Sequence, residues 1–178
     1  FRLQTVALII FLLPGVAVAS TWRKVENPKQ TLFVSVNNKW GFEAPAGITV
    51  RIDDMNHGRS EWVRWGTMAS DRPTAQVNYQ EGKRFNYLGS AFDRFDGWLK
   101  KQHDAQRGNE IDVVQTKYGA AETIGFSKFH KGYDRKCRFF TFLVPDNTVL
   151  FRGYLCDEED GATGVGSIAD FINSLEIQ

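Results

Sequence analysis

The chain has 178 residues, of which 42% are hydrophobic, with 22 Lys and Arg against 21 Asp and Glu. Fourteen Phe, five Trp and five Tyr supply bulky core material, which excludes an intrinsically disordered chain. The nearly balanced charge argues against a nucleic-acid-binding protein, and against one dedicated to anionic membranes, because both need a basic stripe.

The N-terminal segment has the pattern of a secretory signal peptide. A basic residue precedes the unbroken apolar run Val6–Leu13, Pro14 ends it, and Ala17-Val18-Ala19 matches the A-x-A cleavage pattern. The run is shorter than the roughly 20 apolar residues that a membrane-spanning helix needs. We therefore expect residues 1–19 to be removed, leaving residues 20–178 as one exported domain without a stable membrane span.

The first half of this domain has the pattern of strands separated by turns. Runs rich in β-branched and aromatic residues, several of them alternating, occur at residues 31–36, 48–52, 61–66 and 74–79. The polar segment 53–60 between two of these runs is expected to be a loop.

The period changes to that of a helix over residues 90–107. Ser90 is a candidate N-cap, with Asp93 at the capping-box spacing, and Gly108 is a candidate terminator. The apolar face of this predicted helix holds Phe92, Phe95, Trp98 or Leu99, and Gln102 or His103.

A second helix is predicted near the C-terminus, capped by Ser167. Its apolar residues fall at i, i+3, i+4 and i+7, namely Ile168, Phe171, Ile172 and Leu175. Strand character at residues 110–116 and 122–129 precedes it. The expected fold is α+β: an antiparallel β-sheet packed by two helices, on one or both faces, with a disulfide-stapled C-terminal hairpin.

The two cysteines occupy matching positions in that hairpin. The β-rich runs 137–144 and 149–156 flank the turn sequence Pro145-Asp146-Asn147-Thr148, so Cys137 is expected opposite Cys156. A four-residue loop makes them a non-hydrogen-bonded pair, with Cα atoms roughly 4.5 Å apart, whereas a two-residue loop gives a geometry less suited to a disulfide. An even cysteine count in an exported chain favours a structural disulfide over a redox pair or metal thiolates.

Two stretches resemble known exported proteins. Residues 38–45, with the pattern N-x-x-G-F-x-x-P, are similar to the opening of PsbP-like domains, and residues 168–177 look like the closing helix of that family. The hairpin from Cys137 to Gly153-Tyr154-Leu155-Cys156 resembles that of uncharacterised exported alphaproteobacterial proteins. The resemblance implies a fold and an export route, and it implies no established activity.

The sequence holds no recognised catalytic motif. His57 follows Asp53 and Asp54 in a polar segment, and His130 precedes Asp134, but no G-x-S-x-G element or metal-binding spacing accompanies either. We predict no cofactor and no metal. A small hydrolase or metal-dependent enzyme that uses His57 or His130 remains the alternative to a non-catalytic protein.

The most suggestive feature is a mixture of aromatic residues and arginines around residues 62–65. On a strand, Trp62 and Arg64 share one face, while Val63 and Trp65 share the other. A face that shows Trp and Arg has the composition of a protein or glycan contact surface. We therefore predict a periplasmic or extracellular binding or accessory domain, with Trp62, Arg64 and Trp65 as candidate binding residues and an envelope protein or glycan as partner.

Overall fold

The structure is a computed structural model that describes a defined set of segments: residues 21–24, 33–35, 42, 47–53, 58–66, 73–81, 89–97, 105–130, 132–144, 148–157 and 165–177. Within these segments, no helix combines the length and the apolar character that a membrane span requires.

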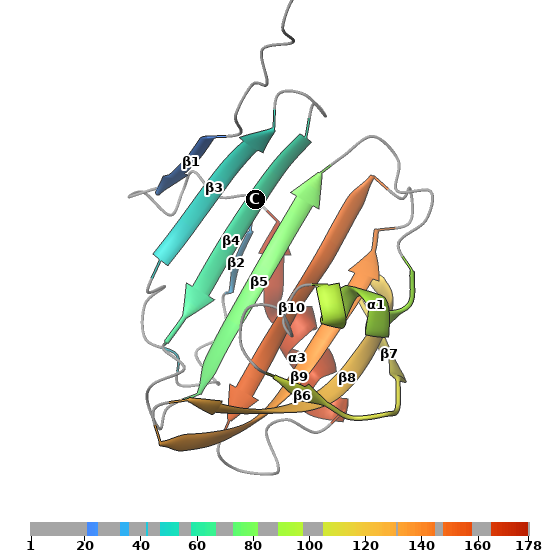
Figure 1. The fold of residues 1–178 in the computed structure, drawn as a ribbon. Helices are drawn as coiled ribbons and strands as arrows, with labels where there is room; N and C mark the ends of the chain where they lie inside the picture. Colours follow the sequence, from blue (N-terminus) through green and yellow to red (C-terminus); the bar gives the residue numbers. More distant parts are fainter. Residues whose placement is uncertain are drawn as a thin grey trace, which may run out of the picture.

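One large antiparallel sheet organises the described residues (Figure 1). Its strands lie in the order β1-β3-β4-β5-β10-β9-β8-β6, β7 also pairs with β8, and β2 pairs separately with β11. The bounds are Thr21–Lys24 for β1, Phe33–Ser35 for β2, Gly47–Asp53 for β3, Gly58–Trp65 for β4, Thr74–Glu81 for β5, Gln106–Arg107 for β6, Asp112–Thr116 for β7, Gly119–His130 for β8, Tyr133–Leu143 for β9, Val149–Asp157 for β10 and Leu175–Ile177 for β11. Because β10 returns between β5 and β9, strands far apart in the sequence meet at the centre of the sheet.

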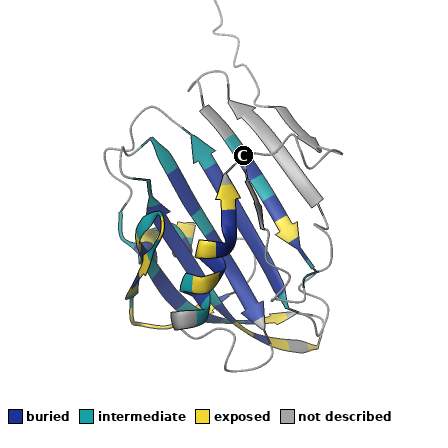
Figure 2. Ribbon diagram, turned by 180° about the vertical axis from the view of Figure 1, so that it is seen from behind, coloured by how far each residue is buried: buried dark blue, intermediate teal, exposed yellow. Residues whose placement is uncertain are grey.

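Two helices lie against opposite faces of this sheet. Helix α1 (Ala91–Phe95) lies in front in Figure 1, and helix α3 (Val165–Ser174) lies in front in Figure 2, which shows the molecule from behind. The prediction of an antiparallel sheet is confirmed. The prediction of two packing helices is confirmed only in part, because α1 is five residues long and the fold is dominated by its sheet.

Each face of the sheet has its own core. The core under α1 contains Ala91 and Phe95 of the helix together with Ile124, Phe126, Cys137, Phe139, Tyr154 and Cys156 of β8, β9 and β10. The core under α3 contains Ile168, Phe171 and Ile172 of the helix and, among its strand residues, Val63, Trp65, Val77, Phe140, Phe142, Phe151 and Leu155. Side chains of the central strands therefore alternate between two apolar layers, as they must when both faces of a sheet are covered.

The predicted helix over residues 90–107 is too long at its C-terminal end. Ser90 caps α1 as expected, and its side chain accepts from the Asp93 N–H at 3.3 Å, but Gln106 and Arg107 form β6 and pair with Ser127 and Phe126. Backbone pairing along β8 outweighs a weak helical pattern here. The predicted face residues 98–103 lie outside the described residues.

The C-terminal helix lies close to its prediction, with shifted ends. It begins at Val165, so Ser167 lies inside the helix rather than at its cap, and residues 175–177 leave it to pair with β2. The four apolar positions that predicted the helix are each 0% exposed: Ile168, Phe171, Ile172 and Leu175.

The segment expected as a loop, residues 53–60, is partly strand. Asp53 ends β3 and pairs with Gly58, the first residue of β4, so the turn between them is shorter than predicted. The polarity of residues 53–60 does not reveal these strand ends, because strand pairing depends on backbone hydrogen bonds with the neighbouring strand.

The cysteine hairpin forms as predicted. Cys156 pairs with Cys137 in the register of β9 and β10, and the two form a disulfide with their Cα atoms 4.0 Å apart. The Val144 N–H donates to the Val149 carbonyl oxygen at 3.0 Å, which leaves four residues in the connection. Cys137 lies seven residues from Val144, so the cysteines form a non-hydrogen-bonded pair, the closer of the two strand geometries.

The cap of α1 predicts a measurable pH effect. The Ser90 N–H donates to Asp93 Oδ2 at 2.9 Å, and hydrogen bonds from the Ser90 backbone and hydroxyl lower the pKa of Asp93. A lowered folded-state pKa means that the carboxylate supports the cap above the ordinary pKa, and that this support is lost as pH falls through the lowered value. In an NMR titration, Ser90→Ala should move the Asp93 pKa upward toward its ordinary value. An unchanged titration midpoint in that variant would contradict this account.

Candidate binding site on the face that carries α1

Strand β4 divides the three predicted binding residues between the two faces. Trp62 is half-buried beside the core under α1, and Arg64 is exposed on the same face. Trp65 is only 3% exposed and packs on Phe171 of α3, with ring centroids 6.3 Å apart. The prediction that Trp65 belongs to a binding surface is therefore wrong, because its face of the strand is core.

Trp62 stands at one end of a row of polar side chains that crosses the sheet. Asn78 of β5 pairs with Trp62 and with Arg152 of β10, Arg152 pairs with Thr141 of β9, and Thr141 pairs with Glu122 of β8. We call these four side chains, Asn78, Arg152, Thr141 and Glu122, the polar row. Because directly paired residues share a face, the polar row lies on the face that carries α1.

Hydrogen bonds hold the middle of the polar row in place. Arg152 Nε donates to Asn78 Oδ1 at 2.9 Å, and Asn78 Nδ2 donates to Ser60 Oγ at 3.0 Å. The Arg152 guanidinium also lies 6.0 Å from the centroid of the Trp62 ring, within the range of a cation–π contact. Arg152 is thus directed toward Trp62 by a buried amide.

A second guanidinium reaches the polar row from helix α1. Arg94 Nη1 donates to Thr141 Oγ1 at 2.9 Å, and Arg94 Nη2 donates to the Gly89 carbonyl oxygen at 2.9 Å. Since Thr141 is the strand partner of Arg152, two cations lie near the same threonine. Helix α1 therefore contributes charge to this face as well as apolar packing.

Burial governs the electrostatics of these two arginines. Desolvation lowers the pKa of Arg152, and the charge of Arg94 lowers it further. Desolvation also lowers the pKa of Arg94, while Glu122 and Asp93 act in the opposite direction. Among the described residues, the buried Oε2 atom of Glu122 has no hydrogen-bond partner, so Glu122 acts on Arg94 through charge rather than through that oxygen's hydrogen bonding.

Arg64 is oriented by its neighbour on β5. Its Nε donates to Gln76 Oε1 at 3.2 Å, and the hydroxyl of Tyr154 donates to the same oxygen at 3.3 Å. Burial raises the pKa of Tyr154, and Arg64 opposes that shift. The exposed cation is therefore tied to a buried amide, which a buried phenol also holds, and this restricts its motion.

The arginines at residues 94 and 152 are functional candidates that sequence reasoning missed. Arg152 interrupts the otherwise apolar run Val149–Cys156, and this break in pattern is the signal that points to it. Arg94 carries no comparable signal, because an arginine on the polar side of an amphipathic helix is ordinary. Only the approach of α1 to β9 reveals it.

The structure describes only part of the alternative enzymatic sites. His57 lies outside the described residues. In the hairpin of β8 and β9, His130 pairs with Tyr133 while Asp134 pairs with Phe129, so His130 and Asp134 are not strand partners. Among the described side chains, no three His, Cys, Asp or Glu residues are grouped closely enough to hold a metal ion.

Comparisons with known proteins find distant structural similarity alone. No protein-family model matches the chain, and no curated protein matches it. Solved structures to which the chain is distantly similar include LpqN of Mycobacterium tuberculosis, which is involved in cell envelope biogenesis; it has a TM-score of 0.41 and 17% identity, over 89% of this chain and 91% of LpqN. They also include the PsbP protein CyanoP of Synechocystis sp. PCC 6803, with a TM-score of 0.40 and 16% identity, over 93% of this chain and 97% of CyanoP. The weak PsbP-like resemblance noted in the sequence is confirmed, and similarity at this level carries no conclusion about activity.

Proposed function

We propose that the chain is an exported, non-catalytic binding domain that contacts an envelope protein through Trp62 and Arg64. The observation that carries this proposal is a half-buried Trp62 beside an exposed Arg64: the Arg152 guanidinium lies by the Trp62 ring, and the buried Gln76 holds Arg64. Trp and Arg are the residue types that dominate binding energy at protein interfaces. Side chains that are oriented before binding lose less conformational entropy on association.

The charges on this face indicate the charge that a partner surface would carry. Arg64, Arg94 and Arg152 all contribute positive charge here, and Glu122 is the acidic member of the polar row. Complementary potentials speed association and exclude partners of like charge. The partner surface is therefore expected to present acidic side chains around a pocket that accepts the edge of Trp62.

Export is part of the same proposal. The signal-peptide pattern of residues 1–19 predicts translocation, and the Cys137–Cys156 disulfide suits an oxidising compartment such as the bacterial periplasm. In a reducing cytosol these two cysteines would stay as free thiols.

A capture experiment tests the contact surface. The protein secreted by its native host is immobilised, and proteins captured from the envelope fraction are identified by mass spectrometry. Arg64→Glu and Trp62→Ala should each weaken capture of the specific partner about tenfold or more, because each removes an interface anchor.

Lys117→Ala is the matched control for this experiment. Lys117 is exposed and lies over the Tyr118 ring at 5.0 Å, so it resembles the Arg–Trp arrangement in chemistry but lies in the turn between β7 and β8. The Lys117→Ala variant should capture as much of the specific partner as the unmodified protein does. Full retention of capture by Arg64→Glu, which leaves the core untouched, would overturn the proposed surface.

A further inference from the structure

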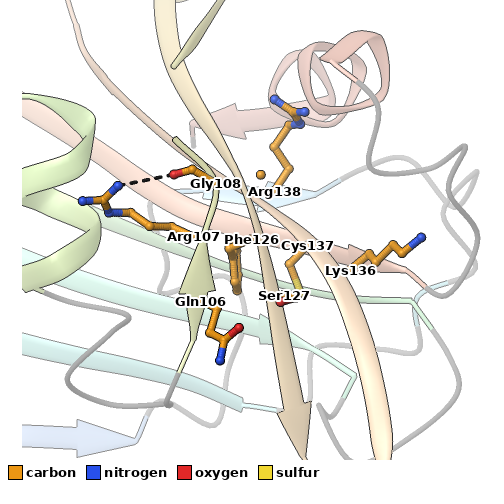
Figure 3. Close-up of a pocket in the computed structure, with 9 residues that line it drawn as sticks. Gln106, Arg107, Gly108, Phe126, Ser127, Lys136, Cys137 and Arg138 are labelled. Carbon is orange, nitrogen blue, oxygen red and sulfur yellow. Dashed lines mark hydrogen bonds between the residues drawn. The ribbon is translucent and has the colours of Figure 1, made fainter. Parts of the chain in front are cut away.

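A groove lies between β6, β8 and β9, and the residues that line it are drawn in Figure 3. Its cavity has a volume of about 480 Å³, and its lining includes Gln106, Gly108, Gly125, Ser127 and Lys136. The groove is open to solvent along the strands. Such a shape suits an extended chain better than an enclosed small molecule.

The groove exists because two glycines face each other across β6 and β8. The Gly108 N–H donates to the Gly125 carbonyl oxygen at 2.8 Å, which continues the strand pairing by one residue. Neither glycine has a positive φ. A Cβ atom on Gly108 would lie 3.3 Å from the Gly125 carbonyl oxygen, whereas one on Gly125 would meet only the Arg138 side chain, at 3.8 Å. Glycine at position 125 therefore provides space rather than an unusual backbone conformation.

Polar side chains border this space from three strands. Ser127 of β8 pairs with Gln106 of β6 and with Lys136 of β9, so these three residues share one face. Arg138 follows on the same face of β9 and donates from Nη1 to Asp112 Oδ2 at 2.6 Å. Arg107 also lines the groove, and its guanidinium forms a salt bridge with Asp96, as that of Arg138 does with Asp112. The groove thus offers a hydroxyl and an amide, which both donate and accept, beside the Lys136 ammonium.

An exposed aromatic ring extends this face toward the tip of the hairpin. Phe129 is 71% exposed and lies two residues beyond Ser127, so the two share a face of β8. Its strand partner, the exposed Asp134, adds a carboxylate acceptor. An aromatic face beside hydrogen-bonding groups matches the two surfaces of a sugar ring, which has apolar C–H groups on its faces and hydroxyls around its rim.

The same face does not fit a protein or a polyanion. Protein interfaces draw most of their binding energy from a few anchors near their centre, above all Trp, Tyr and Arg. Among the described residues, the exposed large hydrophobic side chains are Val113 and Phe129, and Val113 pairs with Glu122, which lies on the other face of β8. Arg107 and Arg138 are neutralised by salt bridges to Asp96 and Asp112, and the exposed Asp134 lies two residues from Lys136 on the same face of β9, so no strong field attracts an anionic polymer.

We propose that this groove binds a neutral glycan chain, with one sugar ring on Phe129 and a ring further along the same chain over the floor formed by Gly108 and Gly125. Ser127 and Gln106 bond to hydroxyl or acetamido groups, and Lys136 donates at the margin. This surface is separate from Trp62 and Arg64. A negative result for the protein partner therefore does not bear on the glycan site, and the reverse also holds.

Titration calorimetry of the secreted protein with chitohexaose, cellohexaose and maltohexaose tests the proposal. At least one of these neutral oligosaccharides should bind with a dissociation constant of about 1 mM or lower. Phe129→Ala should weaken that binding about tenfold, through loss of the aromatic platform. Gly125→Val should weaken it about tenfold or more, by filling the floor.

Two control variants separate this site from the rest of the molecule. Val113→Ala removes the exposed apolar residue of the other face, and Trp62→Ala removes the proposed protein contact; both should bind the oligosaccharide as the unmodified protein does. Failure of all three oligosaccharides to bind, or equal binding by Phe129→Ala and the unmodified protein, would overturn the glycan site. A thermal melt of each variant confirms that it is folded.

Discussion

Replacing Gly153 by Ala should destabilise the domain by about 3 kcal/mol, which lowers the melting temperature by roughly 6–12 °C. Gly153 is buried in β10, where it pairs with Phe140 of β9 and with Val77 of β5. A Cβ atom there would fall on the Gln76 carbonyl oxygen and would lie 2.6 Å from Cζ of Phe140. The oxygen belongs to a backbone fixed in the sheet, and the Phe140 ring is fully buried, so neither can move away cheaply.

Gly125→Ala is the matched control for the Gly153 substitution. Gly125 also lies within a strand, but a Cβ atom there meets only the Arg138 side chain at ordinary van der Waals distance. This variant should melt within a few degrees of the unmodified protein, since its effect stays within about 0.5 kcal/mol. Equal melting temperatures for the two variants would show that the close packing of Phe140 on β10 does not require glycine at position 153.

Loss of the disulfide should produce an effect of similar size. The bond joins cysteines separated by 19 residues, and closing a loop of that length is worth roughly 3 kcal/mol on the chain-entropy model. Both sulfurs are buried in the core under α1, so Cys137→Ser with Cys156→Ser would also place hydroxyls among apolar side chains. The double variant should therefore melt about 6–12 °C lower or more.

Cys137→Ala with Cys156→Ala separates the two contributions. It removes the covalent bond without burying hydroxyls, so it should melt above the serine variant and below the unmodified protein. Intact-mass analysis of protein secreted by the native host should find residues 1–19 absent and both sulfurs oxidised. A secreted product with free thiols and a melting temperature that reductant does not change would contradict the structural role of the bond.

The proposed binding face depends on a buried polar framework. Asn78 is 0% exposed and Thr141 is 1% exposed, yet each receives a hydrogen bond from an arginine. Buried amides and hydroxyls with partners restrict the conformations of the side chains that they contact. Asn78 and Thr141 therefore orient Arg152 and Arg94, and Trp62 lies beside them at the edge of the core under α1.

Sequence patterns with strong periodicity predicted their elements well. The cysteine pair was predictable because the register of a short hairpin follows from the positions of its turn and its two strands. The apolar face of α3 was predictable because four residues at helical spacing have to be buried together. The faces of Trp62 and Arg64 follow from the alternation of any strand.

Other features depended on contacts that no local pattern contains. The amphipathic pattern at residues 90–107 did not reveal that Gln106 and Arg107 pair with β8, because edge pairing is a long-range interaction. Trp65 was assigned to a contact surface because the sequence shows no sign of which face of β4 receives α3. The meeting of Arg94, Arg152 and Thr141 requires the return of β10 beside β9 and the placement of α1 over both.

By itself, the amino-acid sequence determined the disulfide, the alternation of strand faces and the apolar stripe of α3, since each depends on residues linked by a short, regular stretch of chain. Tertiary packing decided which sheet face became core, brought the arginines of α1 and β10 together, and opened the groove between Gly108 and Gly125. The difference is physical: periodicity constrains neighbours along the chain, whereas the identity of a strand's partner is set by the combined burial of distant segments.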